Sequence, residues 1–205
     1  MIEHGELPLL AAEVTEVRAA HERLHAAVAG LGDDELRRDT RLPGWTVAHV
    51  LVHLARNADS IVRRLAAAAE GRVVEQYPGG AAERAAEIEA GVQRGAGEVL
   101  ADLRAADDAV DRVFAAADSS SWAGTVQVGG GGTGPAAALV FRRWREVEVH
   151  HVDLGVGYGW AQWPEALVAR WLPELLTALP DRADPRALVA WTIGRGPAPE
   201  LPPWA

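Results

Sequence analysis

The apolar positions in the first third of the chain repeat at helical spacing. In the first segment they recur at intervals of three and four residues, at Leu10, Val14, Val17, Leu24, Val28 and Leu31. This spacing predicts an amphipathic helix that ends near Gly30 and Gly32. We expect a second helix after Thr46, a suitable N-cap residue. Its apolar positions are Val47, Val50, Leu51, Leu54, Ala58, Ile61, Val62 and Leu65.

The middle of the chain divides less clearly. Residues 81–117 are rich in Ala, Glu and Arg with weak apolar spacing, so they form one long helix or two helices joined near residues 106–108. Residues 122–128 alternate between apolar and polar positions, which predicts one short strand. Residues 129–132 are all glycine and predict a loop that lacks the context of a phosphate-binding loop. Pro135 fits the first turn of a further helix that includes residues 142–154.

The C-terminal part of the chain is turn-rich. Residues 155–160 predict a break, residues 164–179 a helix, and residues 187–193 a helix or a strand. The proline-rich tail from residue 197 onward predicts no regular structure. The resulting prediction is a mainly α protein, in which residues 1–154 form a helical bundle and residues 155–205 form a small mixed α/β region.

Composition narrows the class of protein. A chain of 205 residues with 49% hydrophobic and 24% charged residues is typical of a soluble globular protein with one substantial core. The net charge of −9 argues against nucleic acid or an anionic membrane surface as the main partner. There is no basic-then-apolar leader and no apolar run that could span a bilayer, so we expect a cytoplasmic protein.

The chain contains no cysteine. A disulfide framework and a zinc–thiolate cluster are therefore excluded. The protein also has no thiol nucleophile of its own, so any sulfur chemistry needs a thiol that is supplied as a cofactor.

Residues 142–154, RRWREVEVHHVDL, carry the strongest chemical pattern. Glu146 and His150 are four residues apart, which places both side chains on one face of a helix, with Asp153 next along it. The second helix adds His49 or His53, again four residues apart, and a bundle can bring two such helices together with their ligands facing inward.

One of these histidines, with Glu146 and His150, would give three protein ligands and an open fourth position, as in a catalytic zinc site. A structural metal would need a fourth ligand, for which His49, His151 and Asp153 are candidates. Nickel, iron or manganese would also suit such ligands. The same spacing occurs on ordinary solvated helices that bind no metal.

The other histidines have simpler interpretations. His4 is expected to be solvated, and His21 lies on the apolar stripe of the first helix, which is typical of a core histidine with a hydrogen-bond partner.

Three segments together resemble a known family. They are LPGWTVAHVLVHLARNADSIVRRL at residues 42–65, RRWREVEVHHVDLGVGYG at residues 142–159, and ALVAWTIGRG with the proline-rich end that follows. They are similar to the mycothiol-dependent maleylpyruvate isomerases, which belong to the DinB-like metal-binding four-helix bundles. The resemblance implies that fold, with zinc or another divalent metal and mycothiol as cofactors.

The resemblance also implies site residues. It points to His53 rather than His49 as the metal ligand of the second helix, together with Glu146 and His150. Its Gly-Arg motif corresponds to Arg195, which would bind substrate or thiol.

The implied reaction is the cis–trans isomerisation of maleylpyruvate to fumarylpyruvate in gentisate breakdown. A thiolate adds to the double bond, the new single bond rotates, and the thiol leaves. A dicarboxylate substrate needs cationic groups to bind it, and arginine suits carboxylates. Beside Arg195, the weaker candidates are Arg56, Arg142 and Arg143, each of which we interpret as a surface charge.

Two other functions fit the same residues. One is a mycothiol S-transferase that acts on electrophiles or xenobiotics at the same metal. The other is a non-enzymatic metal-binding bundle that serves as a regulatory or interaction module. The expected partner is a small-molecule dicarboxylate or electrophile, with no nucleic acid and no membrane, and the chain would act as a monomer or homodimer.

Overall fold

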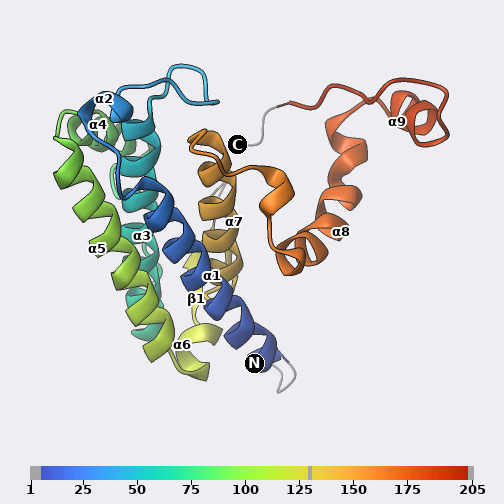
Figure 1. The fold of residues 1–205 in the computed structure, drawn as a ribbon. Coiled ribbons are helices and arrows are strands. Elements are labelled where there is room, and N and C mark those ends of the chain that lie inside the picture. Colours follow the sequence, from blue (N-terminus) through green and yellow to red (C-terminus); the bar gives the residue numbers. More distant parts are fainter. Residues whose placement is uncertain (1–5, 129–130, 203–205) are drawn as a thin grey trace. The chain divides into compact units, whose positions relative to one another are not determined.

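Four long helices form the main body of the protein. The computed structural model describes residues 6–128 and 131–202, and the helices are α1 (Glu6–Val28), α3 (Val47–Ala69), α5 (Ala96–Ala116) and α7 (Ala138–Asp153). Helix α1 packs against α7 and α5, and α3 packs against α5 and α7 (Figure 1). The first two long helices of the sequence thus share the same two neighbours, and the predicted four-helix bundle is confirmed.

Helix α3 is the most buried of the four. It contacts α4, α5, α6 and α7, which explains why its apolar residues are not confined to one narrow stripe. The predicted apolar positions are all buried apart from Val62, which is half-buried. Burying a Val, Leu or Ile side chain contributes about 1.5–3 kcal/mol, so α3 supplies a large part of the apolar stabilisation of the bundle.

The third helical region consists of two helices, α4 (Gly80–Gly91) and α5. The break lies at residues 92–95, so the predicted junction near residues 106–108 is wrong. Gly91, the last residue of α4, packs closely on α3, because a Cβ at this position would lie 2.5 Å from Cγ1 of Val52. Gly95 then caps α5 in an extended conformation.

Short elements connect the end of α5 to the start of α7 and cover that end of the bundle. They are α6 (Ser119–Ala123) and an antiparallel pair of strands, β1 (Thr125–Gln127) and β2 (Thr133–Pro135). Trp122 belongs to α6 rather than to the predicted strand, because the Asp118 carboxylate accepts a hydrogen bond from the Ser121 backbone N–H at 2.8 Å and caps this helix. Residues 129 and 130 of the predicted glycine loop lie outside the described residues.

Pro135 is not in the first turn of α7, as the sequence pattern predicts. It pairs with Thr125 at the end of β2, and α7 begins at Ala138. A proline has no N–H to donate, so the end of a two-stranded ladder accommodates it at little cost.

Residues 162–205 form a second compact unit, separate from residues 1–161. It contains α8 (Glu165–Arg182) and α9 (Pro185–Thr192), and the 3₁₀ turn η2 (Trp160–Gln162) lies at the boundary. Asp184 caps α9 by accepting hydrogen bonds from the backbone N–H groups of Arg186 and Ala187, so the segment that the sequence leaves as helix or strand is a helix. The described part of this unit is helical, and both strands of the described chain lie before α7.

The two units divide between residues 161 and 162, whereas the sequence pattern places the division after residue 154. The turn after α7 stays with the bundle because Tyr158 folds back onto α7. Its hydroxyl donates to Glu148 at 2.5 Å, and its ring stacks on His151 with centroids 4.0 Å apart. In the described residues, no helix is both long and apolar enough to cross a membrane.

Candidate metal centre

The start of α3 sets the direction of its two histidines. Gly44 has φ of 79°, a conformation that favours glycine, and the turn leads through Trp45 to the N-cap Thr46. The Thr46 backbone N–H donates to Nδ1 of His49 at 3.1 Å, and the Thr46 hydroxyl lies 2.7 Å from the same atom. His49 therefore serves as part of the helix cap, and His53 is the α3 histidine that faces α7.

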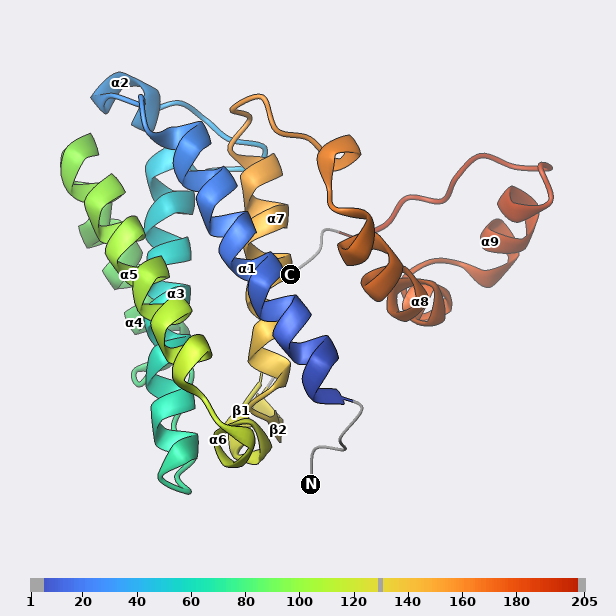
Figure 2. The same cartoon turned by 60° about the horizontal axis from the view of Figure 1, so that its bottom comes forward.

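The three predicted metal ligands lie together between α3 and α7. His53 Nε2 lies 2.7 Å from a carboxylate oxygen of Glu146, and His150 Nε2 lies 3.6 Å from the same oxygen. One donor atom from each of the three residues falls within 4.8 Å of the others. Figure 2 shows the N-terminal end of α3 and the C-terminal end of α7 at the same end of the bundle as α2 (Asp33–Leu36), away from the strands.

Neighbouring side chains hold the two imidazole rings. A carboxylate oxygen of Asp153 lies 2.9 Å from Nδ1 of His150 and can accept a hydrogen bond from it, while His150 Nε2 faces Glu146. Trp45 packs edge-to-face with His53, with ring centroids 5.5 Å apart. A carboxylate behind a histidine is the usual support of a metal-binding imidazole, so Asp153 fits this supporting role.

The electrostatics of the group are those of a buried carboxylate between two imidazoles. Burial lowers the pKa of His53, although its hydrogen bond to Glu146 opposes this. Burial also disfavours the charge on His150, but hydrogen bonds to Asp153 and Glu146 outweigh it and raise the pKa of His150 to about 9. Burial would raise the pKa of Glu146, yet the hydrogen bonds from His150 and His53 bring it well below its ordinary range.

This donor set suits a divalent metal. Two imidazole nitrogens and one carboxylate oxygen are ligands that zinc accepts, and three protein ligands leave a fourth position for a thiol, water or substrate. Across residues 6–128 and 131–202, His53, Glu146 and His150 form the one group of three such side chains whose potential ligand atoms lie within 4.8 Å of one another.

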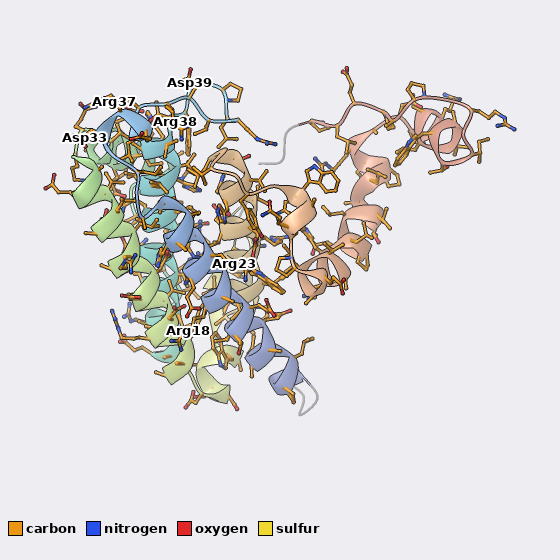
Figure 3. All side chains as sticks on the ribbon, in the orientation of Figure 1. Arg18, Arg23, Asp33, Arg37, Arg38 and Asp39 are labelled. Carbon is orange, nitrogen blue, oxygen red and sulfur yellow. The ribbon has the colours of Figure 1, made fainter. Side chains whose placement is uncertain are left out.

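The alternative ligands on α7 face elsewhere. Glu148 is fully buried, where Arg23 of α1 (labelled in Figure 3) contacts it at 2.5 Å and the Tyr158 hydroxyl donates to it. His151 is stacked on Tyr158, and burial lowers the pKa of His151 to about 4. These residues attach α7 to α1 and to the turn that follows α7, away from His53.

The interpretation of Arg143 as a surface charge is wrong. Its side chain is completely buried and forms an ion pair with Asp107. It also donates to Asn57 at 2.9 Å, to the Leu54 carbonyl at 3.0 Å and to His21 at 3.1 Å. The sequence carried a signal for this burial, because Arg143 lies four residues from both Leu139 and Val147 on the apolar face of α7.

The other predicted residues are placed as follows. His21 is a buried core histidine hydrogen-bonded to Asp111 at 2.9 Å, as expected. Arg56 is half-buried and forms an ion pair with Asp102 at 2.7 Å. His4 lies outside the described residues.

Arg195 lies in the unit of residues 162–205, after α9. Its side chain is exposed and donates to the Gly194 carbonyl at 3.3 Å. It lines a shallow depression with Pro185, Val189 and Ile193. Its role in binding substrate or thiol stays a prediction.

The sequence pattern gave no reason to single out Arg84. This residue is the one basic side chain of α4, where it follows Glu83 and precedes two further glutamates. In the structure its Nη2 lies 2.8 Å from Nδ1 of His53. Only the fold reveals this contact, because α4 and α3 meet through tertiary packing.

The fold and the site together define a four-helix bundle with a His/Glu/His group between two of its helices. The family model for the mycothiol maleylpyruvate isomerase N-terminal domain matches residues 17–155, a range that includes all three of these residues. The chain belongs to this family. No curated protein matches the sequence.

Solved structures share the fold. The mycothiol-dependent maleylpyruvate isomerase superposes with a TM-score of 0.77 at 23% identity, covering 81% of this chain and 69% of that chain. A histidine-to-alanine variant of that isomerase gives a TM-score of 0.76 with the same identity and coverage. YfiT from Bacillus subtilis, described as a probable metal-dependent hydrolase with an unusual four-helix bundle topology, gives 0.57 at 15% identity and covers 83% of this chain and 90% of its own. These structures share the predicted four-helix bundle fold.

Proposed function

We propose that this protein is a zinc-dependent, mycothiol-using enzyme that isomerises maleylpyruvate to fumarylpyruvate. The observation that carries the proposal is the approach of His53, Glu146 and His150 to within 4.8 Å of one another in a chain of the mycothiol maleylpyruvate isomerase family. The structural similarity to the mycothiol-dependent maleylpyruvate isomerase supports the choice of cofactor and substrate.

Different residues of the chain would bind the zinc and orient its ligands. His53, Glu146 and His150 would hold the zinc, which when bound supplies a Lewis acid that lowers the pKa of a coordinated thiol. Asp153 keeps His150 oriented through the 2.9 Å contact with its Nδ1. The chain has no cysteine, so the thiol has to come from outside, and mycothiol meets this need.

A dicarboxylate substrate needs cationic groups to bind it. Arg195 is our proposed residue from the C-terminal unit for binding a carboxylate of the substrate or part of the thiol. Its exposed guanidinium makes no ion pair within the described residues, so it is free to bind an anion.

The direct test is turnover by the purified, zinc-loaded protein. We expect fumarylpyruvate to form from maleylpyruvate only when both zinc and mycothiol are present, as followed by proton NMR. The variant Glu146→Gln should lose this activity, whereas Glu89→Gln, a matched exposed glutamate that faces His49 at 3.5 Å, should keep it. Activity that persists without zinc, or in Glu146→Gln, would contradict the proposal.

A second candidate is a mycothiol S-transferase at the same metal. It is favoured by the extent of the family match, which ends at residue 155 and therefore contains the His/Glu/His group but not Arg195. Conjugation of mycothiol to a bimane electrophile, with no fumarylpyruvate formed, would establish the transferase instead. Zinc binding with neither reaction would favour a non-enzymatic metal-binding module.

A further inference from the structure

Arg84 makes an unusual contact with one of the proposed metal ligands. Its guanidinium Nη2 lies 2.8 Å from His53 Nδ1, while the Nε2 of the same ring faces Glu146 at 2.7 Å. A guanidinium can only donate hydrogen bonds. Nδ1 therefore accepts, and the proton of the neutral His53 ring lies on Nε2, where it points at the Glu146 carboxylate.

This proton arrangement is incompatible with a metal on Nε2. A metal takes the Nε2 lone pair, and a neutral imidazole then carries its proton on Nδ1. Two N–H groups, one from Arg84 and one from His53, would face each other at 2.8 Å. In most metal sites the group behind a ligand histidine is an acceptor, such as a carboxylate or carbonyl, and here it is a donor. Metal binding must therefore break the contact between Arg84 and His53.

Arg84 has no ion-pair partner among the described residues, 6–128 and 131–202. Its Cζ atom lies 6.0 Å from the ring centroid of Trp45 and 5.5 Å from that of Tyr77. Two aromatic rings thus hold a half-buried cation beside the site without neutralising it.

We propose that Arg84 is a substrate-binding residue, which metal binding releases from His53 so that it can bind a carboxylate of the substrate. Guanidinium groups bind carboxylates in bidentate geometry, and the aromatic contacts keep Arg84 near the metal after it leaves Nδ1. This inference rests on the proposed metal centre and adds the residue that recognises the anionic part of the substrate.

A structural role for Arg84 makes the opposite prediction for one measurement. If Arg84 only fastened α4 to α3, removing it would loosen the site and weaken the binding of both zinc and anion. If it competes with zinc for the His53 ring and then binds the substrate, removing it strengthens zinc binding and weakens anion binding. The two roles therefore differ in the sign of the zinc effect.

The first measurement is zinc affinity, obtained by competition with a chromophoric chelator. We expect Arg84→Gln to bind zinc about tenfold more tightly than the natural protein, because a positive charge and an opposing donor are lost. The matched control is Arg104→Gln, an exposed arginine of α5, which should leave the affinity unchanged. Weaker or unchanged zinc binding in Arg84→Gln would overturn the release of Arg84.

The second measurement is the binding of maleate to the zinc-loaded protein by calorimetry, with no thiol present so that no turnover occurs. Arg84→Gln should weaken maleate binding about 10- to 100-fold, as expected for a lost charged hydrogen bond. Arg84→Lys should restore part of it, since the charge returns without the planar fork. Equal maleate affinity in Arg84→Gln and Arg104→Gln would overturn the substrate-binding role.

These measurements separate this inference from the proposed function. Neither of them requires catalysis, so opposite effects on zinc and maleate would support the role of Arg84 even if maleylpyruvate is not isomerised. A natural protein that binds no zinc would contradict both proposals, and the first titration would show it.

Discussion

Two clusters of histidines and carboxylates lie on neighbouring faces of α7, and they differ in the source of their positive charge. The first lies among α1, α5 and α7, and the second between α3 and α7. The first contains His21, His25, Asp107 and Asp111, and the second contains His53, Glu146, His150 and Asp153. Their composition is nearly the same, so residue types alone would suggest two metal sites.

The first cluster already contains its cation. Arg143 is fully buried at its centre and forms an ion pair with Asp107. Three more of its N–H groups donate to Asn57, His21 and the Leu54 carbonyl. A buried carboxylate needs such a partner, because an unpaired buried charge is strongly unfavourable.

Among the described residues, no arginine lies at the centre of the second cluster. In the metal-free protein a proton on His150 balances Glu146, in keeping with the raised pKa of His150. Arg84 contacts the far side of His53 instead of Glu146. We infer that a His/carboxylate cluster can hold a metal ion where the chain itself places no cation at the centre of the cluster.

The largest expected change in stability comes from removing the buried cation Arg143. Arg143→Met should lower the free energy of unfolding by about 3–5 kcal/mol, because Asp107 would remain buried without its ion-pair partner. Urea denaturation of the zinc-free protein measures this, with Arg104→Met as the exposed control.

A double variant separates charge from packing. Arg143→Met combined with Asp107→Leu should recover much of the lost stability, since both charges are then absent. A loss below about 1 kcal/mol in Arg143→Met, or recovery of its stability on adding zinc, would show that the two clusters do not differ as described.

The second cluster should respond to zinc itself. At zinc concentrations about 100 to 1,000 times the dissociation constant, the free energy of unfolding should rise by about 3–4 kcal/mol. The gain should vanish in Glu146→Gln and persist in Glu89→Gln. A gain of equal size in Glu146→Gln would place the zinc elsewhere.

Replacing Asp153, which contacts His150, should reduce zinc affinity less than replacing one of the three proposed ligands. Asp153→Asn should weaken zinc binding about tenfold, because the charged partner that orients His150 is lost. Chelator competition measures the affinity, and Asp108→Asn, an exposed aspartate of α5, serves as control. Identical zinc affinities in the two variants would show that Asp153 does not support His150 as a metal ligand.

The smallest effect concerns the other histidine of α3. His49→Ala should lower the free energy of unfolding by about 1 kcal/mol through loss of the cap contact with Thr46, and it should leave zinc affinity unchanged. Thermal denaturation and zinc titration of the same variant measure both quantities. A large loss of zinc affinity would make His49 a ligand.

The sequence predicted the helices where burial follows the helical repeat. The stripes of α1 and α3 and the spacing of Glu146 and His150 are local patterns, because neighbours on a helix face are three or four residues apart. The choice of His53 over His49 came from the resemblance. The capping contact between Thr46 and His49 gives a physical reason for the same choice.

The remaining features depend on contacts between distant segments. Arg143 is buried because Asp107, Asn57 and His21 come from three other helices, and its own spacing on the apolar face of α7 was the only local sign. The close contact of Gly91 at the end of α4 with Val52 of α3 joins residues far apart in the sequence. Arg84 reaches His53 through the packing of α4 on α3, which the glutamate-rich pattern of α4 does not indicate.

The central claim is that His53, Glu146 and His150 together hold a divalent metal. Anomalous diffraction at the zinc edge from crystals soaked in zinc tests it most directly. We predict one strong peak about 2.0–2.2 Å from Nε2 of His53, a carboxylate oxygen of Glu146 and Nε2 of His150. A peak within the Arg143 cluster, a peak beside Glu148 and His151, or no peak between α3 and α7 would contradict the claim.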